Sequence, residues 1–307
     1  MKKVLITGVA GFLGRQIARQ FSKDGWSVIG VDDLPPENAQ LGIPFTYQRM
    51  KLPSSALDVL LKAEQPDACI HAAGRASVPL SMEDPAADFR DNTVLTFEVL
   101  DALRRCAPRC RFIFLSSAAV YGNPKTLPVS ESQHLAPLSP YGFHKRQCEL
   151  IAQEFARIYA VPSLSVRIFS AYGPGLRRQV VWDICERLIT TRALSLRGTG
   201  GESRDFIHAA DVARALVLLA EKAPAEGEIY NLSTGRETTI SELAAQLASV
   251  LEIPVTANFD GSVRLGDPLN WRADISKLTA LGFTPSVTLE QGLKQVATWA
   301  RAELGAA

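Results

Sequence analysis

Short apolar runs alternate along the first two thirds of the chain with segments whose apolar residues recur at helical spacing. The runs that predict strands are residues 2–6, 27–31, 68–71, 112–115, 163–168 and 229–232. The segments that predict helices are residues 12–21, 84–105, 140–160 and 210–222. Strands that alternate with helices are typical of βαβ units, and strands buried on both faces of a sheet are almost continuously apolar. The pattern therefore predicts an α/β protein with a mostly parallel sheet.

This regularity weakens after about residue 169, where glycines and a proline interrupt the pattern at 173–175 and 198–201. Two more helices are predicted in the tail, at 240–251 and 289–304, and no internal repeat or low-complexity linker separates them from the rest. We therefore expect a small, discontinuous C-terminal lobe packed on the sheet domain. The expected sheet domain comprises residues 1–168 plus about 204–233, and the expected lobe comprises about 169–203 plus 234–307.

A glycine-rich segment separates the first predicted strand from the first predicted helix. Gly8, Gly11 and Gly14 follow a G-x-x-G-x-x-G spacing, and Phe12 and Leu13 open the helix. Glycines permit a tight turn and a close approach of the backbone to a pyrophosphate, while the helix N-terminus offers free N–H groups and the positive end of a dipole. A glycine cluster alone also suits a structural turn, but its place between strand and helix favours a dinucleotide site.

Asp32 lies eighteen residues after Gly14, at the end of the second predicted strand. An acid at this place is expected to bind the ribose hydroxyls of the adenosine. Because a carboxylate repels a 2′-phosphate, NAD is expected rather than NADP. Arg15 and Arg49 are close enough in the sequence to reach such a phosphate, so NADP is not excluded.

A second candidate site begins another predicted helix. Tyr141 and Lys145 are four residues apart and therefore lie on one face, one turn from each other. An ammonium beside a phenol lowers the pKa of the phenol, which makes tyrosine a usable proton acceptor near neutral pH. By itself this spacing is more often a solvated helix face. However, Ser116 and Ser117 end the preceding strand, and the C-terminal ends of parallel strands face the ligand crevice.

Composition and charge exclude several classes of protein. The 307 residues carry a net charge of +1, so no global field favours nucleic acid or an anionic membrane. No apolar run approaches the roughly 18 residues needed to span a bilayer. The five cysteines form no paired framework, which argues against an oxidising compartment and favours the cytoplasm. Cysteines and histidines also lack metal-ligand spacing, so no metal site is expected.

Taken together and in order, these segments resemble the extended short-chain dehydrogenase/reductase family, in particular its NAD-dependent sugar epimerase/dehydratase group. The resemblance implies a doubly wound parallel sheet of the Rossmann type with a small substrate lobe. It covers nearly the whole chain. The matching segments are residues 7–14, Asp32, 71–74, Asn92, 114–122, 139–145, Arg167, 172–175, 200–208, 211–213, 264–268 and 273–278.

The resemblance also implies roles for individual residues. Ser117, Tyr141 and Lys145 match the catalytic triad of the family, whereas Ser116 matches a neighbour of the catalytic hydroxyl. Ser170 stands near the expected substrate, and Arg204 and Arg264 match residues that hold the diphosphate of a sugar nucleotide; a guanidinium suits that role. The residues expected to bind the cofactor are Gly8, Gly11, Phe12, Leu13, Gly14, Asp32, Ala72, Ala73, Gly74, Asn92 and Lys145.

The implied activity is epimerisation of a nucleotide-diphosphate sugar at C4. Tyr141 takes a proton from the hydroxyl while NAD takes a hydride from the same carbon, the keto sugar turns over, and the hydride returns to its other face. A 4-ketosugar reductase that consumes NAD(P)H is the alternative, and a non-catalytic dinucleotide sensor on the same fold is a further one. Dehydration is disfavoured because Ala118 and Ala119 follow Ser117 where dehydrating relatives carry an Asp-Glu pair.

Three departures leave the substrate undetermined, and one of them is the segment 177–182, which matches no single substrate. Residues 48–50 replace a common Gly-Asp-Ile, and Ser170 replaces an asparagine that many relatives carry. Neither the base nor the sugar follows from the sequence. The resemblance further implies a homodimer, formed by the helices predicted at 84–105 and 140–160. The second helix has apolar residues around most of its circumference, so one apolar face can pack on the core and another on a partner.

Overall fold

Seven parallel strands form the central sheet of the computed structural model, which describes residues 1–262 and 268–305. Their order is β11-β6-β5-β4-β1-β2-β3, so the chain reverses direction across the sheet between β1 and β4. The predicted doubly wound parallel sheet is confirmed. The strands are β1 Lys3–Thr7, β2 Ser27–Asp32, β3 Thr46–Arg49, β4 Ala68–His71, β5 Arg111–Ser117, β6 Ser163–Ile168 and β11 Glu226–Leu232.

The edge strand β3 was not expected from the sequence. Its four residues are Thr46, Tyr47, Gln48 and Arg49, and none of them is buried. An edge strand needs no apolar face on both sides, so it lacks the continuous apolar run that identified its neighbours.

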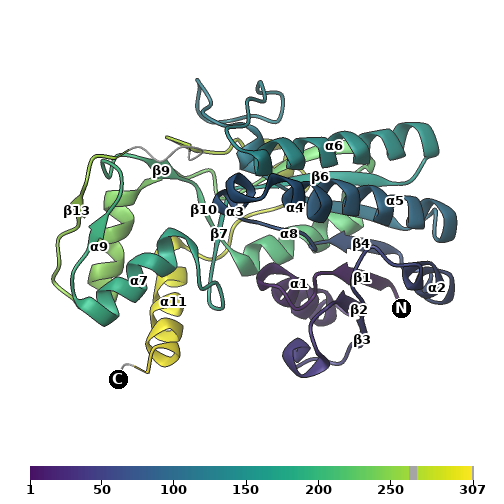
Figure 1. Ribbon diagram of the computed structural model, residues 1–307, viewed down its shortest axis with the longest axis horizontal. Helices are drawn as coiled ribbons and strands as arrows, with labels where there is room; N and C mark the ends of the chain where they lie inside the picture. The colour runs from purple at the N-terminus through teal and green to yellow at the C-terminus, as the bar shows by residue number, and fades with distance from the viewer. Residues whose placement is uncertain (263–267, 306–307) are drawn as a thin grey trace.

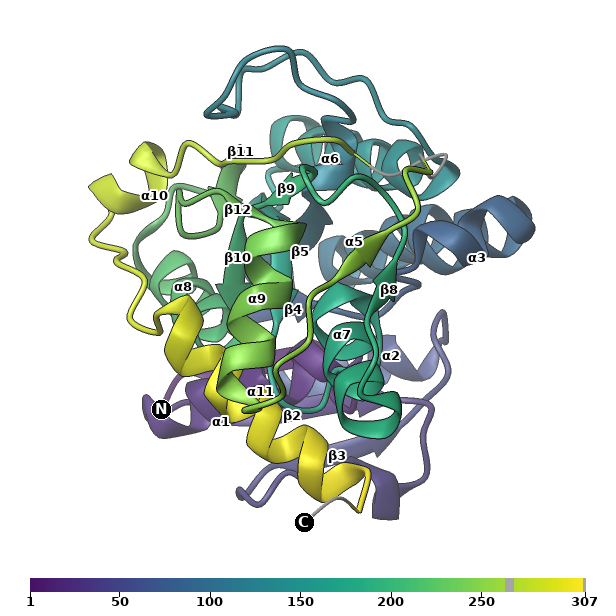
Figure 2. The same ribbon diagram turned by 90° about the vertical axis from the view of Figure 1, so that its left-hand side faces the viewer.

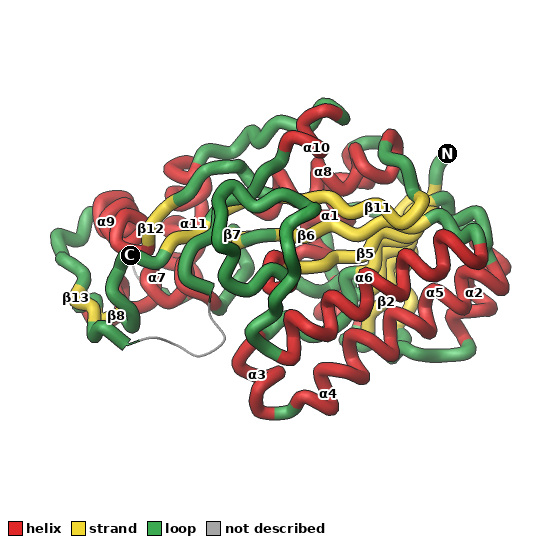
Figure 3. Tube along the Cα trace, turned by 90° about the horizontal axis from the view of Figure 1, so that it is seen from above, coloured by secondary structure: helices red, strands yellow, loops and turns green. Residues whose placement is uncertain are grey.

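Helices cover both faces of the sheet (Figure 3). On one face the sheet packs against α1 Phe12–Lys23 and α8 Ala209–Lys222, with Leu278 of α10 Ser276–Ala280 in the same core. On the other face it packs against α2 Ala56–Glu64, α5 Leu95–Cys106 and α6 Pro140–Tyr159. The two cores fix the direction in which the C-terminal ends of β1, β4 and β5 point.

The helix predicted at 84–105 is not one regular helix. It consists of α4 Pro85–Phe89, a π-helical turn at Arg90–Val94 and α5, and a further short helix, α3 Val78–Glu83, precedes it. Asp84 caps α4 by accepting a hydrogen bond from the Ala87 amide at 2.9 Å. Widened turns of this kind occur frequently at functional sites, and this one carries Asn92.

A second lobe with its own core lies beside the C-terminal ends of the strands (Figures 1 and 2). Its main helices are α7 Gln179–Thr191, α9 Ile240–Val250 and α11 Leu289–Glu303, which pack around Trp182, Leu247 and Leu293. The helix α7 was not expected. The short pairs are β7 Ser170–Tyr172 with β10 Phe206–His208, β8 Ser195–Leu196 with β13 Asn258–Phe259, and β9 Ser203–Arg204 with β12 Thr238–Thr239. Two 3₁₀ turns complete the described elements, η1 Pro36–Ala39 and η3 Ala118–Val120.

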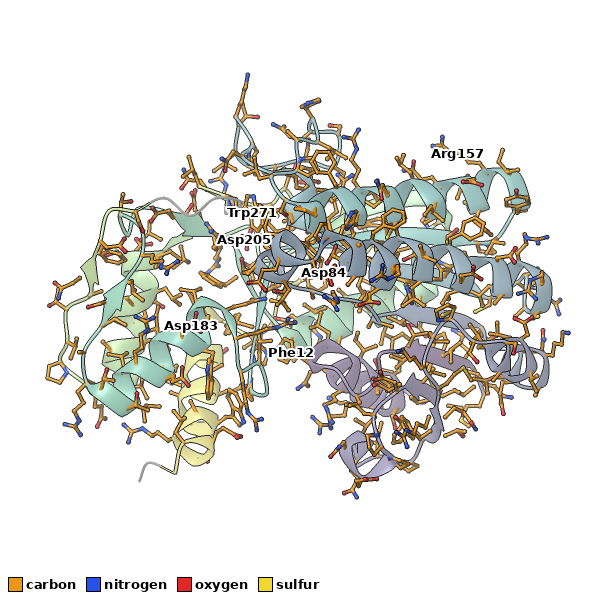
Figure 4. All side chains as sticks on the ribbon, viewed as in Figure 1. Phe12, Asp84, Arg157, Asp183, Asp205 and Trp271 are labelled. Atoms are coloured by element: carbon orange, nitrogen blue, oxygen red, sulfur yellow. The ribbon has the colours of Figure 1, made fainter. Side chains whose placement is uncertain are left out.

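Two buried carboxylates tie the lobe to the sheet. Asp205, labelled in Figure 4, accepts hydrogen bonds from the Ser233 hydroxyl at 2.6 Å and from the Ala273 amide at 3.0 Å. Asp211 in the first turn of α8 accepts from the Ser286 and Val287 amides at 3.0 and 2.9 Å. These contacts join segments far apart in the chain and set the distance between sheet and lobe. The exact domain boundaries expected above stay a prediction.

None of the helices in the described part of the chain is long and apolar enough to cross a membrane.

Candidate active site

A crevice of about 930 Å³ lies between the C-terminal edge of the sheet and the second lobe. Ligands in open α/β sheets bind at this edge, where the order of the strands reverses. Phe12, at the end of α1 that faces the lobe, marks one side of the crevice in Figure 4. Thirteen of the predicted site residues line it: Gly8, Gly11, Phe12, Leu13, Gly14, Ala72, Ala73, Gly74, Ser117, Tyr141, Lys145, Ser170 and Arg204.

The backbone of the glycine segment lies so close to neighbouring backbone that side chains at Gly8 and Gly14 would not fit. Gly8 has a φ of +70°, and a Cβ there would lie 2.7 Å from the amide nitrogen of Ala73. A Cβ at Gly14 would overlap the carbonyl oxygen of Gly8. Gly11 is the N-cap of α1 and offers no side chain to the first amides of the helix, which are therefore open to an anion. This cradle fits the pyrophosphate of a dinucleotide.

Asp32 lies at the end of β2, beside the glycine segment rather than among the residues that line the crevice. Its Oδ2 accepts a hydrogen bond from the Ala10 amide at 2.9 Å, so the carboxylate also holds the glycine loop. Arg15 and Arg49, the two arginines because of which the sequence did not exclude NADP, both donate to backbone carbonyls. Arg15 donates to the carbonyls of Ala10 and Gln40 at 2.7 and 3.0 Å, and Arg49 donates to that of Asp33 at 3.2 Å.

The loop after β4 forms the neighbouring wall of the crevice. His71 is buried, and its Nδ1 lies 2.7 Å from the hydroxyl of Thr7. Burial, together with the smaller effect of the charge of Lys145, lowers the pKa of His71 to about 3. Gly74 has a φ of +125°, and a Cβ there would lie 2.7 Å from Oδ1 of Asn92. Asn92 thus stands behind the loop and is not among the residues that line the crevice, and its expected part in cofactor binding stays a prediction.

Ser117, Tyr141 and Lys145 come together at the floor of the crevice. Ser117 ends β5, and its hydroxyl accepts a hydrogen bond from the Ala119 amide at 3.2 Å. Tyr141 and Lys145 lie in the first two turns of α6, which Ser139 caps by accepting from the Gly142 amide. The ammonium of Lys145 donates to the Leu115 carbonyl at 3.1 Å and lies 5.7 Å from the centre of the Tyr141 ring.

The pKa of Tyr141 is raised in this structure, although its place beside the Lys145 ammonium predicted a lowered pKa. Burial raises the pKa of Tyr141 to about 12; a hydrogen bond with Ser117 and the charge of Arg178 oppose this shift. Burial also lowers the pKa of Lys145. The physical reason is that both groups are almost fully enclosed, and loss of hydration disfavours their charged forms.

A buried polar network supports this floor from behind. The Ser116 hydroxyl donates to Glu149 at 2.6 Å, so this hydroxyl is engaged with the buried network even though Ser116 lines the crevice. Glu149 pairs with Arg167 at 2.7 Å, and Arg167 donates to the Tyr121 hydroxyl at 2.8 Å. These groups are all buried, so breaking one contact would leave an uncompensated charge next to β5.

The opposite wall belongs to the lobe and is rich in arginine. Arg204 lies with its guanidinium carbon 5.5 Å from the centre of the Trp271 ring, and both residues line the crevice. Arg264 lies outside the described residues. Sequence reasoning missed Arg178 and Arg187 of this wall. The signal for Arg178 was the segment 177–182, which matches no single substrate and proved to contain the start of α7. Arg187 lies further along the same helix.

This arrangement provides an anion cradle, a buried phenol beside a serine hydroxyl and an ammonium, and a facing wall of cations. Such a set suits removal of a proton from a bound alcohol whose phosphate groups are held by the lobe.

Comparison with known proteins gives relatives over nearly the whole chain. A putative UDP-glucose 4-epimerase of Methanocaldococcus jannaschii is 29% identical over 302 residues, which are 96% of this chain and 97% of that protein. The UDP-glucose 4-epimerase of Thermotoga maritima, solved with UDP-glucose, is 29% identical, with a TM-score of 0.90 and coverage of 98% of this chain and 99% of that one. The UDP-glucuronic acid 4-epimerase of Bacillus cereus, solved with UDP-glucuronic acid and NAD, has the same TM-score and coverage at 27% identity.

The match to a family covers most of the chain: it runs from β1 through β11 and includes the glycine cradle and the three groups at the floor of the crevice. Residues 4–233 match the NAD dependent epimerase/dehydratase family, and the chain therefore belongs to that family.

Proposed function

We propose that this protein is an NAD-dependent epimerase that inverts C4 of a nucleotide-diphosphate sugar. The observation that carries the proposal is the meeting of three features in one crevice. Ser117, Tyr141 and Lys145 form its floor, the glycine cradle forms one end, and the arginine-rich lobe forms the facing wall. Relatives that act on UDP-sugars support uridine diphosphate sugars as the first substrates to test.

The residues present fit NAD. The cradle at Gly8, Gly11 and Gly14 would hold the pyrophosphate, and the carboxylate of Asp32 would accept hydrogen bonds from the adenosine ribose. When bound, NAD supplies a reversible hydride acceptor. Because Arg15 and Arg49 donate to backbone carbonyls, neither supports a preference for NADP.

In the proposed mechanism Tyr141 accepts the proton of the C4 hydroxyl and returns it after the sugar has turned over. The Ser117 hydroxyl donates to the sugar oxygen. Tyr141 accepts the proton in its phenolate form, which Lys145 stabilises, and stays a neutral phenol until it returns the proton. Arg204 holds the diphosphate, so that the sugar can rotate while it stays bound. Since the pKa of Tyr141 is about 12, the reaction is expected to speed up as the pH rises through the neutral range.

The absence of further proton-transferring groups beside Ser117 favours epimerisation over dehydration. Ala118 follows Ser117 and is fully buried, and Ala119 comes next. Dehydration would need an acid and a base for C5 and C6 in addition to the Tyr141 phenol. Neither alanine can move a proton.

The test is incubation of the purified protein with UDP-, dTDP-, GDP- and CDP-sugars in deuterated water, with NMR of the products. We expect a C4-inverted sugar without deuterium at C4 or C5, because the original hydride returns. Tyr141→Phe should lower turnover by roughly 10²–10⁴ while cofactor binding is retained. Tyr159→Phe, on the exposed end of the same helix, is the matched control and should keep full activity.

Three outcomes would contradict the proposal. Deuterium at C5 or a 4-keto-6-deoxy product would indicate enolisation or dehydration. Stoichiometric consumption of added NADH or NADPH would indicate a ketosugar reductase. Binding of NAD without any turnover would indicate a dinucleotide sensor.

We further propose that the protein works as a homodimer in the cytoplasm. The dimer is supported by apolar side chains exposed along α6, including Leu150 and Ile158. A reducing compartment is supported by the five cysteines, all of which are buried and free.

A further inference from the structure

One residue of the catalytic turn of α6 makes a contact that the proposed mechanism does not use. His144 lies between Tyr141 and Lys145 in the sequence, and its Nδ1 is 2.6 Å from Oδ2 of Asp88 on α4. The Asp88 side chain is 0% exposed and that of His144 is 12% exposed. The pair therefore joins α4 to the turn that carries both proposed catalytic groups.

Asp88 also contacts the cofactor side of the crevice through its backbone. Its carbonyl oxygen accepts a hydrogen bond from Nδ2 of Asn92 at 3.1 Å. The Oδ1 atom of Asn92 lies so near Gly74 that a Cβ there would be 2.7 Å away. A continuous set of contacts thus runs from His144 through Asp88 and Asn92 to the loop that ends at Gly74.

This link is costly for stability alone. Oδ1 of Asp88 and Oδ1 of Asn92 are buried, and neither has a hydrogen-bond partner within the part of the chain that the structure describes. Buried polar atoms left without partners cost free energy, and buried ion pairs can often be replaced by apolar groups without loss of stability. Packing alone does not explain why the protein keeps these costly buried polar groups, whereas a role in the site would.

We propose that Asp88 is a positioning residue: by holding His144 and Asn92, it keeps the turn that carries Tyr141 and Lys145 in register with the loop 72–74. This rests on the proposed function, since it concerns the groups that move the proton and the loop that would border the cofactor. Asp88 touches neither substrate nor cofactor in this arrangement. Its effect is transmitted by its carboxylate, which contacts His144, and by its backbone carbonyl, which accepts a hydrogen bond from Asn92.

The charge of Asp88 gives the proposal a signature that a purely structural residue would not have. Asp88 raises the pKa of Tyr141 and that of Lys145, although burial is the largest influence on both. The other groups that act on Tyr141 are Ser117, Arg178 and Cys148, and those that act on Lys145 are Cys148 and Glu149. Removal of the negative charge therefore lowers the pKa of Tyr141. The acid limb of kcat/KM should then move to lower pH, because the base form persists to lower pH.

The test compares substitutions that separate charge from contact. Asp88→Asn removes the charge and keeps an acceptor for His144, whereas Asp88→Ala removes the contact. His144→Asn keeps a donor near the position of Nδ1, and His144→Phe removes it. Asp101→Ala on α5 is the control, since Asp101 pairs only with surface arginines, Arg104 and Arg105, among its described contacts.

We expect Asp88→Ala and His144→Phe to lower kcat by on the order of 10-fold to 100-fold with little change in KM, because misplaced groups react slowly even when substrate binds. The same variants should speed amide hydrogen exchange both in residues 72–74 and in the first turn of α6. His144→Asn should restore both properties to near wild type. Asp88→Asn should shift the acid limb to lower pH, and Asp101→Ala should leave kcat, the limb and the exchange unchanged.

The proposal is overturned if Asp88→Ala and His144→Phe leave kcat and exchange at both places unchanged, or if Asp101→Ala produces the same changes. Failure of the proposed function is recognised separately, because the wild-type protein would then invert no sugar. In that case the exchange data alone decide the proposal: coupled loosening of the two segments supports it, and loosening of neither or of only one refutes it.

Discussion

At the scale of single residues, burial controls the chemistry of the site more strongly than neighbouring charge. Tyr141, Lys145 and His71 are all buried, and in each case loss of hydration is the largest cause of the shifted pKa. A group tuned in this way responds to a change in its surroundings, such as closure of the crevice, more than to any single partner.

His71 should make the stability of the protein depend on pH. Its pKa is about 3 in the folded state and near 6.5 when exposed, so below pH 6.5 the unfolded chain takes up a proton that the folded one does not. The contribution of His71 to stability is therefore complete above pH 6.5 and is lost as the pH falls toward 3, by up to about 1.4 kcal/mol per pH unit.

Urea unfolding of the wild type and of His71→Gln from pH 4 to 8 measures this effect. The difference in unfolding free energy between the two proteins should narrow as the pH falls. His134→Gln, at an exposed position, is the control and should run parallel to the wild type. A constant difference for His71→Gln would show that the pKa of the ring is the same in the folded and the unfolded protein.

At the scale of elements, the first βαβ unit depends on contacts between backbones. The start of α1 passes so close to the turn after β1 that Gly14 has no space for a methyl group next to the Gly8 carbonyl. This closeness brings the open amides at the N-terminus of α1 to the edge of the sheet. The element therefore requires glycine for packing and for binding at once.

Gly14→Ala should destabilise the protein even though alanine is the better helix former. The gain of about 1 kcal/mol expected for alanine in a helix is smaller than the cost of pushing α1 away from the turn, about 1–3 kcal/mol for overpacking. We expect a lower melting temperature and weaker NAD binding. Gly201→Ala is the control, because its φ is not in the left-handed region and its Cβ would meet nothing closer than 3.4 Å. An unchanged melting temperature for Gly14→Ala would contradict the close approach.

At the scale of the whole molecule, the second lobe is held by buried carboxylates, and one outer face is left apolar. Phe143, Leu150 and Ile158 lie at i, i+7 and i+15 on α6 and therefore share one side of the helix. Phe97 of the neighbouring α5 is exposed as well. A face of this kind commonly marks an interface between subunits.

Leu150→Asp should convert the proposed dimer into a monomer. Leu150 is 57% exposed in the single chain, so the change costs little in the folded monomer and places a charge in the interface. Light scattering at micromolar concentration should give twice the chain mass of 33.3 kDa for the wild type and the single mass for the variant. Val59→Asp, on the exposed side of α2, should stay dimeric. A wild-type mass of one chain would refute the dimer.

The sequence by itself determined the features that depend on residues close together in the chain. Apolar runs such as 68–71 and 163–168 predicted buried strands with the bounds the structure gives them, and the glycine spacing located the turn before α1. The four-residue spacing of Tyr141 and Lys145 placed both on one side of a helix. Periodicity and turn geometry are local properties, which is why they can be read from the sequence.

Only the tertiary structure decided how distant segments act on one another. The polar edge strand β3 forms because it pairs with β2, and the helix α7 forms because its apolar residues pack in the core of the lobe. The π-helical turn at Asn92 interrupts what the apolar pattern presents as one helix. The contact of Asp88 with His144 joins residues 56 positions apart. The pKa of Tyr141 likewise depends on how completely other segments enclose it. Hydration and packing are set by the whole fold, so neither can be read from the residues nearest in the chain.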